Sequence, residues 1–172
     1  TLSDTTPPSW ETGYPIVNSP TDSSASVGVI MNEAGTWFWS VVAFGASTPT
    51  STQVMSGLDG SGSSAIAAGN STAAGLASSV ATVQSVLAAS TNYDVWFVAQ
   101  DDEPTPNVQA SATKVSFVTA ADSTPPVFET GYPVVSSVAD FSIAVSVQLS
   151  EPGRWYWAVL VDGAAGPSVA QV

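Results

Sequence analysis

The sequence of 172 residues contains no cysteine and no histidine, and its only basic residues are Lys114 and Arg154. Without thiol or imidazole side chains, it lacks the groups used by most catalytic triads and by zinc sites. Fourteen acidic residues give a formal net charge of −12, which opposes binding to nucleic-acid phosphates and to anionic membrane surfaces. No apolar run reaches the roughly 18–20 residues that span a bilayer. We therefore expect neither a nucleic-acid partner nor membrane insertion in this segment.

Carboxylate chemistry is the remaining route to catalysis, and the candidate residues are Glu11, Glu33 and Asp94. Hydrolysis by a carboxylate pair needs two such groups at a defined separation, and no spacing in the sequence singles out a pair. The sequence therefore predicts that the chain is not an enzyme and has no catalytic residues.

A long internal repeat organises the chain. Positions 4–17 read DTTPPSWETGYPIV and recur at positions 122–135 as DSTPPVFETGYPVV, and the same offset of 118 positions continues to Val172. A period this long indicates a tandemly copied domain rather than a solenoid. We expect one complete module over residues 1–121, starting at Asp4, and the opening part of a second over 122–172. The Thr-Pro-Pro step that begins each copy predicts a stiff, extended linker.

The second copy covers the first 51 positions of its template, residues 122–172. A partial module exposes the apolar faces of its strands and an unpaired edge, which is costly in water. We expect it to be completed either by further chain or by strands from another molecule. Both routes favour a long surface protein or a polymer.

Period-two alternation of apolar residues, interrupted by turn signals, predicts short antiparallel strands. The predicted strands cover 13–17, 25–31, 36–44, 80–88, 93–99 and 113–119. Positions 50–58 predict a short helix or turn, and the Gly/Ser/Ala/Thr-rich positions 56–79 predict a long surface excursion. The predicted fold class is all-β, an antiparallel β-sandwich in tandem repeat with the second copy incomplete.

The segment from Leu87 to Ala99 carries the pattern of a tyrosine corner, because Tyr93 begins a strand six residues after a leucine. Its hydroxyl is expected to bond to upstream backbone. With the DTTPP opening, the EAGTWFWSV strand and the YDVWFVAQDDEPTPN segment, this pattern resembles fibronectin type III and immunoglobulin-like repeats of bacterial, algal and protist surface proteins. Adhesins and mastigoneme-like filaments are built from such repeats. No Arg-Gly-Asp tripeptide is present, so the resemblance does not extend to integrin binding.

Asp101, Asp102 and Glu103 form an acidic loop that we place near the module end, close to Asp122. Oxygen ligands suit Ca²⁺, and a calcium-stiffened junction would make an array rigid. The alternative is a solvated charged loop restrained by prolines, which the lack of a twelve-residue calcium loop favours. No other metal or cofactor is predicted.

Three consecutive aromatic residues mark the strongest predicted strand, and the second copy repeats them. They are Trp37, Phe38 and Trp39 in the first copy and Trp155, Tyr156 and Trp157 in the second. The tryptophans lie two apart and share one face, which we expect to be core. Phe38 and Tyr156 lie on the other face and are expected to pack against a linker, a glycan or a neighbouring subunit. An aromatic platform for sugar rings is the alternative.

Several positions are candidates for glycosylation. Asn70-Ser71-Thr72 is an N-glycosylation sequon. The O-glycosylation candidates are threonines before proline, as in Ser/Thr/Pro-rich stalks, at Thr6, Thr48, Thr105 and Thr124. Resemblance to algal surface fibres adds hydroxylated, glycosylated prolines at Pro7, Pro8, Pro125 and Pro126. The alternative is that these Thr-Pro and Pro-Pro sequences serve only as ordinary turns and linkers.

These features predict an extracellular or cell-surface protein that is the structural subunit of a filament or appendage. Its expected partners are copies of itself, with covalent glycans as a possible coat. The alternative function is a monomeric cell-surface adhesin, or a carbohydrate-binding or spacer module of a secreted protein.

Overall fold

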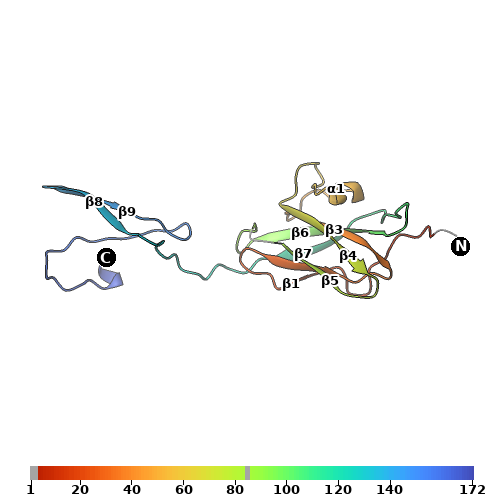
Figure 1. Cartoon of the computed structure of the whole chain (residues 1–172), viewed down its shortest axis with the longest axis horizontal. Coiled ribbons are helices and arrows are strands. Elements are labelled where there is room, and N and C mark those ends of the chain that lie inside the picture. The colour runs from red at the N-terminus through yellow and green to blue at the C-terminus, as the bar shows by residue number, and fades with distance from the viewer. Residues whose placement is uncertain (1–3, 84–85) are drawn as a thin grey trace. The chain divides into compact units, whose positions relative to one another are not determined.

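The computed structural model describes residues 4–83 and 86–172 (Figure 1). The chain divides into two compact units, Thr1–Asp122 and Ser123–Val172, which we call unit 1 and unit 2. Most of the regular structure is strand, and every strand pair is antiparallel, so the chain is all-β. No helix in the described residues has the length and apolar character needed to cross a membrane.

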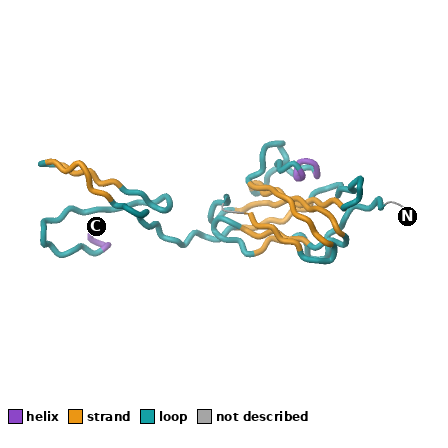
Figure 2. Tube along the Cα trace, in the orientation of Figure 1, coloured by secondary structure: helices purple, strands orange, loops and turns teal. Residues whose placement is uncertain are grey.

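Unit 1 contains a three-stranded sheet of order β1-β2-β5 and a four-stranded sheet of order β4-β3-β6-β7 (Figure 2). The elements are β1 (Ile16–Asn18), β2 (Ala25–Val29), β3 (Ala34–Ala43), α1 (Ser51–Met55), β4 (Ala67–Ala74), β5 (Ser79–Val83), β6 (Asn92–Asp101) and β7 (Thr113–Val118). The strands predicted at 25–31, 36–44, 93–99 and 113–119 match β2, β3, β6 and β7 to within two residues. The strand predicted at 80–88 ends at Val83, and residues 84 and 85 lie outside the described part of the chain.

One apolar core draws side chains from both sheets. Val27 from β2, Trp37 from β3 and Phe97 from β6 are fully buried in it, and Trp39 is nearly so. Alternate residues of a strand point to the same side, so the period-two pattern places one face of each strand in this core. The two tryptophans of the repeat motif therefore lie inside unit 1.

Strand β4 was not predicted, because the surface excursion expected at 56–79 covers it. Residues 67–74 pair along their whole length with β3, from Ala34 opposite Ala74 to Val41 opposite Ala67. Their inward residues are small for a physical reason: a Cβ added to Gly69 would lie 2.8 Å from Cζ2 of Trp39. The Trp39 ring occupies the space that a larger strand residue would fill.

The outward faces of β3 and β6 are covered by residues 44–66. This segment includes α1, within the short helix or turn expected at 50–58. Thr50 caps α1 with a reciprocal Thr50–Gln53 capping box. A second apolar cluster forms beneath this segment, with Val54 of α1 packed near Trp96 of β6. Phe38 is partly buried and packs against this cluster, and its expected contact with a linker, a glycan or a neighbouring subunit stays a prediction. The outward face of β3 is apolar at this position because residues 44–66 of the same chain cover it.

Unit 2 contains the hairpin β8 (Val134–Ala139) and β9 (Ser142–Ser146) and the 3-10 turn η1 (Val169–Gln171). Local details of unit 1 recur at the same offset. The Ser9–Asn32 contacts return as Val127–Ser150 contacts, both Tyr-Pro bonds of the GYP motif are cis, and the capping box returns at Ser168. These local features of the structure therefore repeat with the sequence, although the counterpart of β3 at 152–161 is not a strand.

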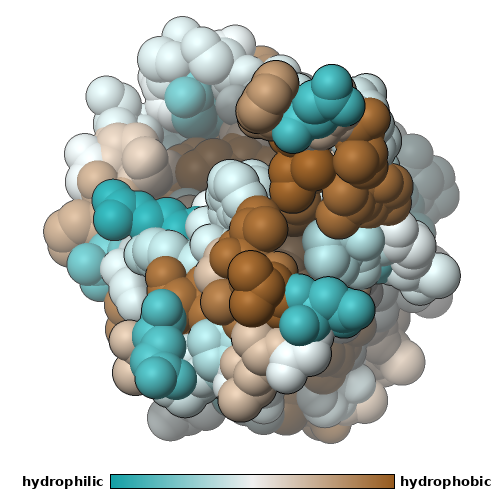
Figure 3. Space-filling view, turned by 90° about the vertical axis from the view of Figure 1, so that its left-hand side faces the viewer, coloured by the Kyte–Doolittle hydropathy of each residue, from teal (hydrophilic) through white to brown (hydrophobic). Residues whose placement is uncertain are grey.

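The aromatic motif of unit 2 is more exposed than that of unit 1. Trp155 is half-buried, while Trp157 is 54% and Tyr156 67% exposed. They border an apolar hollow of about 450 Å³, because the described residues of unit 2 include no counterparts of β4, β5, β6 and β7, and positions 152–161, the counterpart of β3, form no strand. Brown patches in Figure 3 mark apolar side chains at the molecular surface.

Candidate functional site: the two ends of unit 1

The Asp4–Pro8 segment is fastened to unit 1 by side-chain amides. The carbonyl of Asp4 accepts a hydrogen bond from Asn107 Nδ2 at 3.1 Å, and the carbonyl of Pro8 accepts one from Gln109 Nε2 at 2.9 Å. The Ser9 N–H donates to Asn32 Oδ1 at 2.7 Å. This segment, expected to be a linker, is therefore part of the module, and we call this the N-terminal end of unit 1.

The chain leaves unit 1 at a second set of contacts. The Thr119 hydroxyl donates to the carbonyl of Ala88 at 2.6 Å, and the Ala120 N–H donates to the carbonyl of Thr21 at 2.9 Å. We call this the C-terminal end. Strand β6 connects the two ends, because Asn92 pairs with Val118 near the exit and the strand runs ten residues to Asp101. At 3.3–3.4 Å per residue this span is about 30 Å.

Tyr93 lies at the C-terminal end and holds the loop that precedes β6. Its hydroxyl accepts a hydrogen bond from the Ala88 N–H at 2.8 Å. Its ring stacks on Phe117 with centroids 5.7 Å apart, and Leu87 is buried beside it in the core. This is the contact to upstream backbone that the tyrosine-corner pattern implies.

Replacing Tyr93 with phenylalanine tests that contact. We expect Tyr93→Phe to lower the free energy of unfolding by about 1–2 kcal/mol, because the ring stays packed while the Ala88 N–H loses its partner. Urea denaturation measures the change. Tyr14→Phe is the matched control, since the Tyr14 hydroxyl forms no hydrogen bond with the residues that the structure describes, and a loss as large in that variant would contradict the assigned role.

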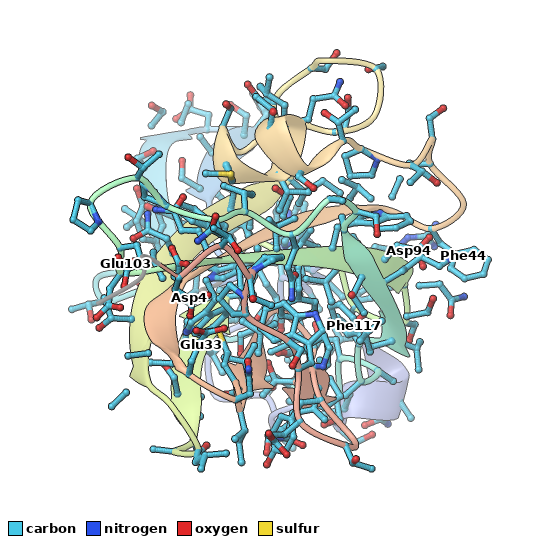
Figure 4. The ribbon with its side chains drawn as sticks, turned by 90° about the vertical axis from the view of Figure 1, so that its right-hand side faces the viewer. Asp4, Glu33, Phe44, Asp94, Glu103 and Phe117 are labelled. Atoms are coloured by element: carbon cyan, nitrogen blue, oxygen red, sulfur yellow. The ribbon has the colours of Figure 1, made fainter. Side chains whose placement is uncertain are left out.

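Acidic side chains gather at the N-terminal end, where Figure 4 shows Asp4 and Glu33 close together. Partial burial and the charges of Asp4, Asp101 and Asp102 raise the pKa of Glu33, against the effect of a hydrogen bond from Asn32. Asp101 behaves differently, because Asn107 donates to its two carboxylate oxygens from N and Nδ2 at 2.8 and 2.7 Å. Burial opposes ionisation of Asp101, but these bonds outweigh it and lower its pKa.

The structure does not bring together the acidic residues of the calcium hypothesis. Asp101 lies at the far end of β6 from the exit of β7, so it is at the opposite end of unit 1 from the segment that leads to Asp122. The sequence argument overlooked the direction of the strand. Among the residues the structure describes, no group of three acidic side chains is placed to hold a metal ion. Asp101 instead fastens the loop that ends at Asn107.

Asp94 forms a polar anchor that the sequence argument did not assign. It lies fully buried in β6, where Ser116 Oγ donates to Oδ1 at 2.6 Å and the Gly45 N–H donates to Oδ2 at 3.0 Å. Lys114 Nζ lies 3.5 Å from Oδ2 and also stands over the Trp96 ring. Burial favours the neutral acid, but these partners outweigh it and lower the pKa of Asp94. The anchor joins β6, β7 and the start of the covering segment.

The glycosylation candidates differ in accessibility. The exposed ones are Asn70, Thr6, Thr48, Thr105, Thr124, Pro125 and Pro126. Pro7 is half-buried. Pro8 is buried and its carbonyl is bonded to Gln109, so a sugar on Pro8 does not fit the folded unit. Asn70 lies on the exposed side of β4, at the edge of its sheet.

Comparison of the chain with protein-family models, with curated proteins and with solved structures finds no match in any of the three.

Proposed function

We propose that the chain is a structural repeat protein whose modules are β-sandwiches of the fibronectin type III kind, joined in tandem in an extracellular filament or appendage. The observation that carries this proposal is that the chain enters unit 1 at one end and leaves at the other, about 30 Å away. Tandem modules built this way add length with each copy. The sheet orders β1-β2-β5 and β4-β3-β6-β7, together with the Tyr93 contact, support the sandwich assignment.

The anchoring of both ends supports a mechanical role. Unit 1 holds the chain through Ala120, and Asp4 is the counterpart of Asp122. If each repeat fastens its own opening segment as unit 1 does, the connection between modules shortens to the residues around Ala121. A short connection restricts bending more than a flexible linker of several residues. Load on the array then passes through the hydrogen-bonded ends of each module.

Electron microscopy of the native material, isolated without denaturant, tests this function. We expect filaments or extended rods whose axial repeat is at least about 30 Å per module. Mass spectrometry of the same material shows whether Asn70 and the exposed threonines carry sugars. Compact dispersed particles with no axial repeat would contradict the filament.

The exposed aromatic pair in unit 2 favours one second candidate, a carbohydrate-binding adhesin or spacer module. Tyr156 and Trp157 present ring surface to solvent, and aromatic rings of this kind serve as contact surfaces. Binding on a glycan array that is lost in Tyr156→Ala would favour this function. Phe38 does not contribute to it, because the covering segment packs over that position in unit 1.

A further inference from the structure

The four edge strands of unit 1 differ in how well they are protected against pairing with another chain. β1 has three residues and lies between Pro15 and Pro20. β5 has five residues. β7 carries Lys114 and is approached by the opening segment, since Trp10 Nε1 donates to Thr113 Oγ1 at 3.0 Å. Short strands, prolines, charges and covering segments are the usual devices that block edge-to-edge association.

β4 lacks these devices. It has eight residues, pairs with β3 in continuous register, and contains no charge and no proline. It ends the sheet order, so its other side faces no strand of this sheet. At its C-terminal part the Ser79 hydroxyl donates to the carbonyl of Thr72 at 2.7 Å, so the turn toward β5 satisfies that one group. In a chain of net charge −12, this uncharged edge is where two copies repel each other least.

We propose that β4 pairs antiparallel with β4 of a second copy, which joins two four-stranded sheets edge to edge. A two-fold axis matches each residue with its symmetric counterpart. In an antiparallel pair, the side chains of directly opposite residues lie on the same face of the sheet. The two-fold axis must therefore pass through a residue near the strand middle and not between two residues. An axis at Asn70 pairs the largest part of β4 while leaving Ala74 unpaired, because the turn to β5 begins at Ala74. Ala68 then lies opposite Thr72 on the outward face, where the Thr72 carbonyl keeps a second lone pair beside its bond from Ser79, and no like charges oppose each other.

This geometry connects the edge to the sequon. With the axis at Asn70, the two Asn70 side chains lie about 4.5–5.5 Å apart between Cβ atoms on the same exposed face. Two sugar chains cannot occupy that space. Pairing through β4 is therefore expected only in chains that carry no sugar on Asn70. The inference goes beyond the proposed filament, because it concerns lateral contacts between neighbouring chains. It applies equally to chains that are free in solution.

Single-cysteine crosslinking tests the pairing directly, because the chain has no cysteine of its own. The full chain is made without glycosylation as Asn70→Cys, with Thr82→Cys on the exposed side of β5 as the control. We expect Asn70→Cys to form disulfide dimers about tenfold faster than the control, because the axis brings its two sulfurs within bonding range. Equal rates in the two variants would overturn the proposal.

A second measurement separates β4 from any association through unit 2. Sedimentation equilibrium of the unglycosylated full chain at about 0.5 mM, a range suited to a small interface, should show dimers that increase with salt as the like charges are screened. The double variant Ala68→Glu/Thr72→Glu should lose those dimers, while Val80→Glu/Thr82→Glu, with the same added charge on β5, should keep them. Dimers unaffected by the β4 substitutions, or no dimers in the unmodified chain, would refute β4 pairing.

Discussion

Gly35→Ala is expected to lower the free energy of unfolding of unit 1 by about 3 kcal/mol or more. Gly35 pairs with Asp101 where β3 and β6 meet at the N-terminal end. A Cβ at position 35 would overlap the carbonyl oxygen of Gln100 and lie 3.0 Å from Cα of Asp101. Both obstacles are backbone atoms of the partner strand, so the central pair of strands must separate locally to admit a methyl group.

Thermal unfolding followed by circular dichroism checks this result, and a loss of about 3 kcal/mol corresponds to a fall in Tm of roughly 10–15 °C. Gly28→Ala is the matched control, because Gly28 also lies in a strand but its added Cβ would meet neighbours only at 3.5–3.6 Å. That variant should stay within about 1 kcal/mol of the parent, with a small gain available from reduced unfolded-state entropy. Equal losses in the two variants would show that the close approach at Gly35 is not what limits this position.

The strands predicted best are those whose own residues decide their conformation. β3 and β6 are rich in aromatic and β-branched side chains, so their composition alone predicts buried strands. The repeat at an offset of 118 likewise needs nothing beyond the sequence. These two signals placed Trp37 and Trp39 in the core.

The features that were missed depend on partners distant in the sequence. β4 is made of Ala, Gly, Asn, Ser and Thr, whose strand preference is weak, and it forms because β3 presents tryptophan rings that only small residues accommodate. The sequence does contain a signal for Asp94, since a carboxylate inside an apolar strand is costly unless it has partners. Its partners Ser116 and Gly45 become neighbours only once β3, β6 and β7 are paired. The acidic loop was placed beside Asp122 wrongly for the same reason, because strand direction decides which end of unit 1 each acidic residue occupies.

Asp94→Asn is expected to lower the free energy of unfolding at neutral pH by about 2–4 kcal/mol, because a buried, multiply bonded carboxylate loses its charge while its donors remain. The asparagine amide can accept at one oxygen only and turns its NH₂ group toward either the Gly45 N–H or the Ser116 hydroxyl. The partly exposed Lys114 contributes less, since solvent screens its pairing. Amide exchange at Gly45 should accelerate at least about tenfold as the start of the covering segment loosens.

The pH dependence of stability distinguishes loss of charge from simple loss of packing. Asp94 has a pKa in the folded protein below its ordinary value of 3.8, so its contribution is complete above that value and is lost as the pH falls through the folded-state pKa. The parent protein should therefore lose stability in this acidic range more steeply than Asp94→Asn, and the two should converge at the lowest pH. Asp102→Asn removes the same charge from an exposed site and should follow the parent curve. A constant difference between the parent and Asp94→Asn at every pH would mean that Asp94 acts through its shape alone. Convergence would establish that an ionised carboxylate holds the covering segment over the outward face of the sheet.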